Sequence, residues 1–384
     1  MIGYLAANDG TISGHATDTA DGIMRSSGRN TGNLAFWQAT RLLFKEEVVF
    51  IPWKTKGQQL PKNLTALVIP AANFIGSHSN LAPITEIITD LDVPTMVVGL
   101  GAQSESENVL PVVNDSVRRF LTEASKRAPY LAVRGEYSAH VCRQFGVPNV
   151  KILGCPSVFL NGNPDLGKIV EDKMARLEPS NVAIHAACRK GNITNVEREF
   201  VRYVQLFQGS AYVVQRPPEL VGAMLRESLK PPEMAYLGDM AQFLGMASIQ
   251  ELEKFLRTFG YVPTSIDSWR SYLRKFSCSI NTRIHGTMVA FQAEIPALCV
   301  VHDTRTRELA AQTKLPSLEV ARFIEGRYDI KRLFSSTNFS GAAFDSWRQK
   351  IAGEYLTLLT AMKLTPSARL FALAEGPARV TKVA

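Results

Sequence analysis

The sequence predicts an α/β protein made of two consecutive units, each with a parallel sheet covered by helices. Short continuous apolar runs alternate with segments of helical periodicity in both halves of the chain, which is typical of parallel strands buried on both faces. The 384 residues suffice for two domains of ordinary size. Hydrophobic residues make up 46% of the chain and charged residues 20%, so the composition argues against disorder.

In the first half, we predict strands from four apolar runs: 65–70, 95–101, 130–134 and 150–154. Helical stretches follow the second and third runs, over 116–127 and 137–145, and Gly146 is a suitable stop for the latter. Strand, helix and strand in this order favour parallel pairing.

The second half repeats the scheme, with strands predicted at 181–187, 211–215, 277–281 and 297–301. Two helix starts are predicted from capping boxes, one at Thr194 with Glu197 and one at Ser248 with Glu251. A further helix is expected to begin near Thr287.

The polar, apolar-poor segment 162–181 is the predicted junction between the units. We therefore expect domains at 1–165 and 178–335, followed by C-terminal helices over 340–384 that pack back on the first domain. Within these helices, Asp345 is the expected cap and Pro366 the expected first-turn residue. Two such domains leave a cleft between them, and ligands of open α/β sheets bind beyond the carboxyl ends of the strands.

The charge and motif content limit the function. A formal charge of +8 and a pI of about 9.2 favour an anionic partner, but the basic residues are dispersed, so we do not expect nucleic acid. The five cysteines lie far apart without a CxxC pair, and no Walker, HExxH or GxSxG motif occurs, so neither a metal nor a cofactor is expected. We expect a cytoplasmic protein, since the chain shows neither a signal peptide nor a long apolar run.

The most informative stretch is Arg283-Ile284-His285-Gly286, which follows a predicted strand and precedes a predicted helix. Free amides at a helix N-terminus favour anions, an arginine adds a planar fork for carboxylate or phosphate, and a histidine can donate a proton near neutral pH. An anionic substrate that must be protonated would use all three. The alternative is a helix cap whose arginine pairs with a nearby acid.

Other polar clusters also stand beyond predicted strands or before a predicted helix. Their candidate residues are Asn30 and Asn33 in the loop 26–33, Gln103 in GLGAQS, Arg134 and Ser138 after 130–134, Arg189 in HAACRKGN, and Arg305 in HDTRTR. Each cluster could bind an anion or a sugar, or could simply cap a helix or form a solvated ion pair.

Four segments together resemble the polysaccharide pyruvyl transferase family: NTGNLAFW, VGLGAQS, AVRGEYSAHVCRQFGVPNVKILGCPSVFL and NTRIHGTMVAFQAEIPALCVVHDTRTRELA, spanning about 30–312. The resemblance implies a GT-B-like fold, with two Rossmann-like domains facing across a cleft. It implies phosphoenolpyruvate as the donor substrate and a sugar of a polysaccharide or its precursor as acceptor, joined as a pyruvate ketal. Many relatives carry an acidic residue where this chain has Cys155.

With this chemistry, His285 is the expected acid that protonates the methylene carbon of the donor, or else a phosphate ligand only. The expected donor-binding residues are Arg283, Ile284, Gly286, Arg134, Arg189 and Arg305. Those expected on the acceptor side are Asn30, Asn33, Gln103 and Ser138. The first domain is the expected acceptor side and the second the donor side.

Two other functions stay open at this stage: a nucleotide-sugar-dependent glycosyltransferase of similar fold, and a non-catalytic glycan-binding relative. The acceptor sugar, its attachment to a lipid, the ketal positions and the oligomeric state are left open as well. The C-terminal stretch carries Lys363, Arg369, Arg379 and Lys382 among apolar residues, which is typical of a membrane-surface segment, although packed helices with solvated charges would show the same pattern. We expect at most a weak, salt-sensitive association with the inner membrane face.

Overall fold

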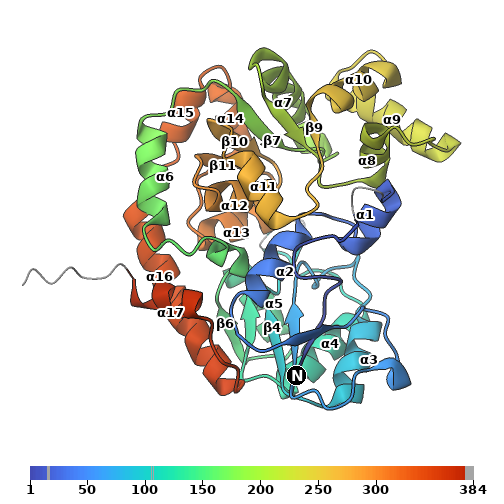
Figure 1. Ribbon diagram of the computed structural model, residues 1–384, viewed down its shortest axis with the longest axis vertical. Coiled ribbons are helices and arrows are strands. Elements are labelled where there is room, and N and C mark those ends of the chain that lie inside the picture. Colours follow the sequence, from blue (N-terminus) through green and yellow to red (C-terminus); the bar gives the residue numbers. More distant parts are fainter. Residues whose placement is uncertain (15–17, 105, 107, 377–384) are drawn as a thin grey trace, which may run out of the picture.

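The computed structural model describes residues 1–14, 18–104, 106 and 108–376, and it contains two parallel sheets (Figure 1). The first sheet has the order β2-β1-β3-β4, and a parallel bridge from Leu100 to Val133 continues it toward the pair β5-β6. Its strands are β1 (Ile2–Tyr4), β2 (Val48–Phe50), β3 (Ala66–Pro70), β4 (Thr95–Val98), β5 (Leu131–Val133) and β6 (Val150–Ile152).

The second sheet has six parallel strands in the order β12-β11-β10-β7-β8-β9. They are β7 (Val182–His185), β8 (Ala211–Val213), β9 (Gly260–Tyr261), β10 (Cys278–Asn281), β11 (Ala297–Val301) and β12 (Ser317–Glu319). Ile280 of β10 lies level with Ile184 of β7 and Leu298 of β11, all three buried. The predicted α/β class with two Rossmann-like units is confirmed.

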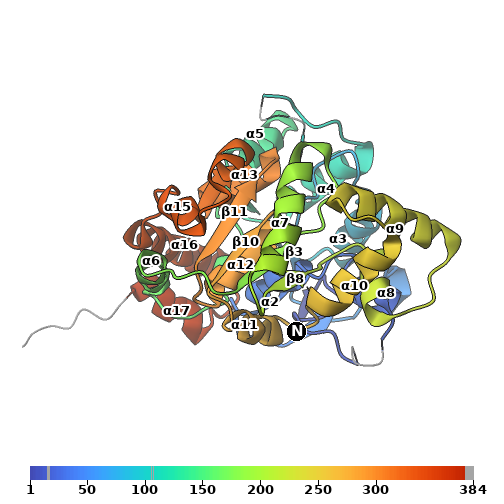
Figure 2. The same ribbon diagram turned by 90° about the horizontal axis from the view of Figure 1, so that it is seen from above.

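Helices cover both sheets. Those up to the second sheet are α1 (Ala20–Ser26), α2 (Asn33–Arg41), η2 (Gly57–Gln59), α3 (Ala82–Leu91), α4 (Asp115–Lys126), α5 (Glu136–Gln144), η3 (Pro156–Phe159) and α6 (Leu166–Ala175). Those of the second unit are η4 (Gly191–Ile193), α7 (Thr194–Leu206), α8 (Pro218–Leu225), α9 (Pro231–Leu244), α10 (Ile249–Phe259), α11 (Ile266–Leu273), α12 (Ile284–Gln292), α13 (Thr304–Gln312), α14 (Val320–Gly326) and α15 (Ile330–Ser335). The last two are α16 (Gly341–Ala361) and α17 (Ala368–Glu375). Helices α8, α9 and α10 gather on the side of the second unit opposite α6, α15 and α16 (Figures 1 and 2).

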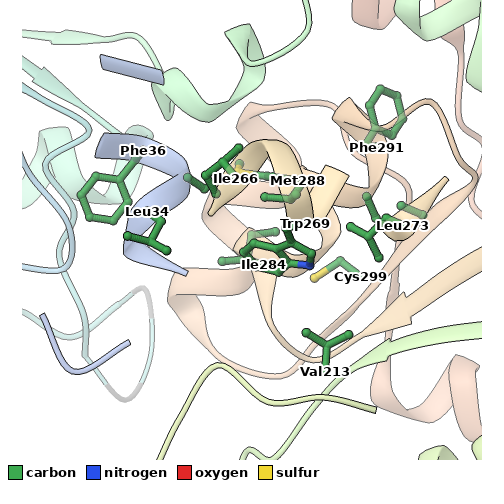
Figure 3. Packing of buried hydrophobic residues seen from close by; sticks show 14 of the residues in the cluster. Leu34, Phe36, Val213, Ile266, Trp269, Leu273, Ile284, Met288, Phe291 and Cys299 are labelled. Atoms are coloured by element: carbon green, nitrogen blue, oxygen red, sulfur yellow. The ribbon is translucent and has the colours of Figure 1, made fainter. Parts of the chain in front are cut away.

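The two faces of the first sheet belong to different hydrophobic clusters, as the period-2 alternation of a strand requires. Leu67 and Ile69 face a cluster formed with α3, α4 and α5. Val68 faces the larger cluster, which continues into the second unit. Helix α2 joins the units, because it packs against α11 and α12 (Figure 3) and the ring of Phe36 contacts that of His285. The two units therefore share one continuous apolar core.

The C-terminal helices lie against both α6 and the first unit (Figure 1). Tyr355 of α16 meets Phe159 edge-on with ring centroids 5.5 Å apart, and Lys151 of β6 pairs with Glu354. The backbone amide of Lys45 donates to Thr365 at 2.9 Å. No helix among the described residues has the length and apolarity needed to cross a bilayer. Arg379 and Lys382 lie outside the described residues.

Two predicted details of the C-terminal helices are wrong. Ser340 caps α16, whereas Asp345 lies inside that helix and caps α6 instead, by accepting from the amides of Gly167 at 2.7 Å and Lys168 at 3.1 Å. Pro366 precedes the N-cap of α17 and so stands outside its first turn. The cap of α6 is thus supplied by a different helix, which no local sequence pattern shows.

Of the three helix starts predicted in the second unit, one is confirmed and two differ from the structure. Ser248 caps α10 by accepting from the Glu251 amide at 3.2 Å, as predicted. The capping box at Thr194 is wrong, because α7 begins at Thr194 itself and the Glu197 carboxylate points into the core. Helix α12 begins at Ile284, earlier than the predicted start at Thr287.

The capping of α6 by Asp345 of α16 gives a first prediction. Replacing Asp345 by Ala leaves the Gly167 and Lys168 amides without their acceptor, and should lower the free energy of unfolding by about 1–2 kcal/mol, as for loss of an N-cap. Urea denaturation measures the change, and Lys350→Ala on the exposed side of α16 is the matched control. Equal effects of the two variants would show that the cap does not stabilise the fold.

Candidate functional site

The carboxyl ends of the two sheets face each other, and their loops are joined by direct hydrogen bonds. The Thr31 amide donates to the Gln215 carbonyl at 3.1 Å, beyond β8. The Thr304 hydroxyl donates to the Ser104 carbonyl at 3.2 Å. Polar residues that the sequence places after separate strands are thereby brought to one region.

His285 lies in this region, in the first turn of α12. It is buried, its Nε2 lies 3.8 Å from the Cys155 sulfur, and its ring centroid lies 5.3 Å from that of Phe36. Burial, reinforced by the nearby charges of Arg134 and Arg305, holds the pKa of His285 well below its usual value of 6.5. The imidazole is therefore neutral near pH 7 while no anion is bound.

Arg134 and Arg305 come from opposite units and each has a buried N–H group without a partner among the described residues. Arg134 donates from Nε to the Gly99 carbonyl at 2.8 Å, but its Nη2 has no acceptor. Arg305 lies 3.5 Å from Asp303, but its Nε has no acceptor. Burying such donors unsatisfied is costly. A bound anion that reached these N–H groups would satisfy them.

Arg283 occupies the N-cap position of α12 and is half-buried. Its Nε donates to the Ala186 carbonyl at 3.0 Å, and its Nη2 donates to the Ala187 carbonyl. The turn after β7 therefore fixes this guanidinium. Arg134, Arg283, His285 and Arg305 are called the Arg–His cluster below.

Ile284 and Gly286 contribute to the packing of α12 rather than offering a side chain to a ligand. Ile284 is buried in the apolar core (Figure 3). A Cβ on Gly286 would lie 2.4 Å from Cγ of His185, so only glycine lets α12 approach β7 this closely. At these two positions, the backbone N–H groups in the first turn of α12 are the groups that can bind an anion.

His185 of β7 packs against α12 at Gly286 and was not predicted as a site residue. Trp269 donates from Nε1 to His185 Nε2 at 3.1 Å, and Asn281 Oδ1 lies 2.5 Å from His185 Nδ1. Because an indole N–H can only donate, Nε2 is the acceptor and Nδ1 carries the proton. Burial lowers the pKa of His185 to about 4. It is thus a neutral structural group.

Arg189 has partners of its own at the edge of the region. Its guanidinium lies 2.9 Å from Asp239 and 5.7 Å from the ring centroid of Tyr236, with both charged groups well exposed. Arg216, which was not predicted, is exposed as a residue, but partial burial of its guanidinium, followed by the charges of Arg283 and Arg305, lowers its pKa. Its place after the predicted strand 211–215 was the available signal, since the other candidates follow strands in the same way.

The acceptor-side candidates are engaged with neighbouring groups. Asn30 accepts from the Gly32 amide at 3.0 Å, and Asn33 donates to the Ser27 carbonyl at 3.0 Å, so both hold their own loop. Gln103 accepts from Asn73 at 2.5 Å.

Ser138 is buried at the start of α5, where it contacts a carboxylate of the other unit. Its hydroxyl donates to Glu308 of α13 at 2.9 Å, and its amide donates to the same carboxylate at 2.7 Å. This pair of bonds holds the end of β5, and with it Arg134, beside α13. Within the described ranges, no group of His, Cys, Asp and Glu has the makings of a metal site.

Comparison with known proteins gives one family and several distant structures. A family model for polysaccharide pyruvyl transferase matches residues 30–304. No match was found among curated protein sequences.

Among solved structures, S. aureus MnaA with UDP is 12% identical, with 95% of this chain and 98% of that chain covered at a TM-score of 0.44. A Neisseria meningitidis UDP-GlcNAc 2-epimerase bound to UDP-GlcNAc is 13% identical, with 77% and 76% covered at 0.39. A trehalose-6-phosphate synthase is 12% identical, with 90% and 79% covered at 0.38.

The buried neutral histidines predict how stability depends on pH. Burial lowers the pKa of His185 and of His302 to about 4, whereas an unfolded histidine titrates near 6.5. Between these values the unfolded chain binds more protons, so the free energy of unfolding should fall as the pH is lowered from about 6.5 to 4. For His185 alone the full loss is about 3 kcal/mol.

Chemical denaturation at several pH values tests this, with the wild type compared with His185→Gln. The variant is expected to be less stable at pH 7.5 but to lose less stability on acidification. Parallel pH profiles would show that His185 does not contribute to the acid sensitivity.

Proposed function

Because the chain belongs to the polysaccharide pyruvyl transferase family, we propose that it transfers the pyruvyl group of phosphoenolpyruvate to two hydroxyl groups of a sugar, forming a ketal and releasing phosphate. One observation carries the proposal: neutral, buried His285 lies near the guanidinium groups of Arg134 and Arg305, whose unpartnered donors call for an anion. Phosphoenolpyruvate carries two anionic groups and needs a proton on carbon.

The donor would be held by its carboxylate and its phosphate. Guanidinium groups match both in planar, bidentate geometry, and Arg134, Arg283 and Arg305 supply three of them. The amides of Ile284 and Gly286 at the N-terminus of α12 add donors to the same region. Arg189 would contribute from the edge after release from Asp239.

In the proposed mechanism, His285 takes up a proton when the anionic donor binds, and it then transfers this proton to the methylene carbon of the donor. The adjacent carbon becomes electron-deficient and is attacked by the first sugar hydroxyl, whose proton restores His285. The second hydroxyl then displaces phosphate, and its proton leaves with that group. A well-placed general acid contributes about 10²–10⁴-fold, and the remaining acceleration is assigned to orientation and charge stabilisation by the arginines.

The first domain, 1–165, is proposed as the acceptor side, with Asn30, Asn33, Gln103 and Ser138 around the sugar. Asn30, Asn33 and Gln103 form hydrogen bonds within the first unit, and Ser138 binds Glu308 of the second unit. The second domain, 178–335, is the proposed donor side. For the whole protein we propose a cytoplasmic enzyme of polysaccharide, including exopolysaccharide, synthesis with at most weak membrane association.

Incubation with phosphoenolpyruvate and a panel of glycans tests the proposal. Release of phosphate together with a pyruvyl mass gain on a glycan would support it. A product formed only from UDP- or GDP-sugars would identify a glycosyltransferase instead, and binding of glycans without turnover of either donor would identify a glycan-binding protein.

The acid assigned to His285 predicts a specific loss. His285→Ala should lower kcat by at least about 10²-fold with the fold retained. His140→Ala, on the exposed side of α5, is the control and should keep normal turnover. An increased KM with normal kcat would instead make His285 a phosphate ligand only.

The electrostatics predict that donor binding takes up a proton. His285 is neutral in the free protein because of burial and the charges of Arg134 and Arg305. An anionic donor reverses the sign of the local field and raises the pKa of His285. Calorimetric titration with phosphoenolpyruvate at pH 7, in two buffers of different ionisation enthalpy, should report uptake of up to about one proton, and His285→Ala should abolish it. Binding without proton uptake in the wild type would place the acid elsewhere.

A further inference from the structure

Glu197 of α7 is a fully buried carboxylate without a role in the mechanism above. Its Oε2 accepts from the Ala187 amide at 3.0 Å, and its Oε1 accepts from the Cys188 amide at 3.2 Å. The Thr282 hydroxyl donates to Oε1 at 2.7 Å, and the Tyr212 hydroxyl lies 3.4 Å from Oε2. A buried carboxylate with this many donors is a built feature of the protein.

The donors come from two segments that reach the site. Ala187 and Cys188 form the turn after β7, and Thr282 joins β10 to α12. Glu197 therefore ties together the carboxyl ends of two neighbouring strands. The sequence analysis assigned this glutamate to a capping box. Its carboxylate instead binds the turn nine and ten positions earlier and Thr282, which lies 85 positions later.

The turn held by Glu197 is the one that holds Arg283. The carbonyls of Ala186 and Ala187 accept from the Arg283 guanidinium, while the Ala187 and Cys188 amides donate to Glu197. Ala187 has a φ of 63°, a left-handed conformation that is unfavourable for a residue with a side chain. Such a turn needs external bonds to persist.

We propose that Glu197 is a positioning residue for Arg283, which it orients by fixing the backbone turn at Ala186–Cys188 from one side while Arg283 binds the other. The inference rests on the proposed donor-binding role of Arg283. Burial raises the pKa of Glu197, and the nearby charge of Arg283 acts in the opposite direction, which places the two side chains in one electrostatic environment.

The first test compares Glu197→Gln with Glu199→Gln, a control on the same helix whose carboxylate pairs with Arg202 and Arg327. The amide keeps the shape of the side chain but presents N–H groups to at least one N–H donor of the turn. We expect KM for phosphoenolpyruvate to rise about tenfold or more in Glu197→Gln, the scale of one lost hydrogen bond to a charged group. The change in kcat should be smaller, and Glu199→Gln should keep both constants.

Thr282→Val removes one of the bonds to Glu197 and leaves its carboxyl group in place. It should raise the same KM to a smaller degree, and it replaces Glu197→Gln if that variant fails to fold. If kcat fell and KM rose only in proportion to the loss of thermal stability, Glu197 would have a purely structural role. Unchanged KM in both variants would overturn the proposal.

A second test does not depend on turnover. In a double-mutant cycle on the unfolding midpoint, Glu197→Gln and Arg283→Lys should act non-additively, since both loosen the same turn. If the wild type does not turn over phosphoenolpyruvate, the proposed function fails, while the cycle still decides whether the two residues are coupled. Additive effects would refute the positioning role itself.

Discussion

The close approach of α12 to β7 is the constraint on which the site depends. Gly286 leaves no room for a side chain above His185, and Trp269 and Asn281 fix the imidazole from both of its nitrogens. Gly286 fixes which face of α12 packs against β7. Because successive residues of a helix point about 100° apart, the side chain of His285 points away from β7. His285 thereby reaches Phe36 and Cys155 of the first unit. One interface thus decides which side of the helix packs and which side meets a ligand.

The second organising principle is that the acids of the region are occupied while the cations are not all neutralised. Asp303 lies 2.6 Å from Lys190. Glu308 accepts from Ser138, and Glu197 accepts from backbone amides. Arg134 and Arg305 keep buried donors without acceptors. The protein therefore buries cationic N–H donors that its own acids do not satisfy, and an anion that bound to them would offset this cost.

Most of the fold could be predicted from the sequence because buried parallel strands appear as continuous apolar runs. The four predicted runs of each half correspond to strands of the structure, whereas β1, β2, β9 and β12 were missed. These are two or three residues long, and three of them lie at sheet edges, where neither length nor hydrophobicity gives a signal. The family-linked residues Arg134, His285 and Arg305 were found from their places beyond strands. Arg216 follows a predicted strand as the other candidates do and could have been included. His185 and Glu197 were missed because their roles arise from contacts between segments far apart in sequence, and a short motif such as a capping box competes with such contacts.

The Asp345 cap has a consequence for biosynthesis. It joins α6 to a helix 178 positions later in the chain, and residues 365–367 bond to the segment 42–46 across more than 300 positions. During translation the amino-terminal part leaves the ribosome long before these partners exist. Its sheet can begin to assemble, but α6 and the strand edge near Lys45 stay incomplete until the final helices emerge. The molecule is therefore closed by its last-made segment, and nascent chains that stall before residue 341 would expose apolar surface to chaperones rather than wait as a finished domain.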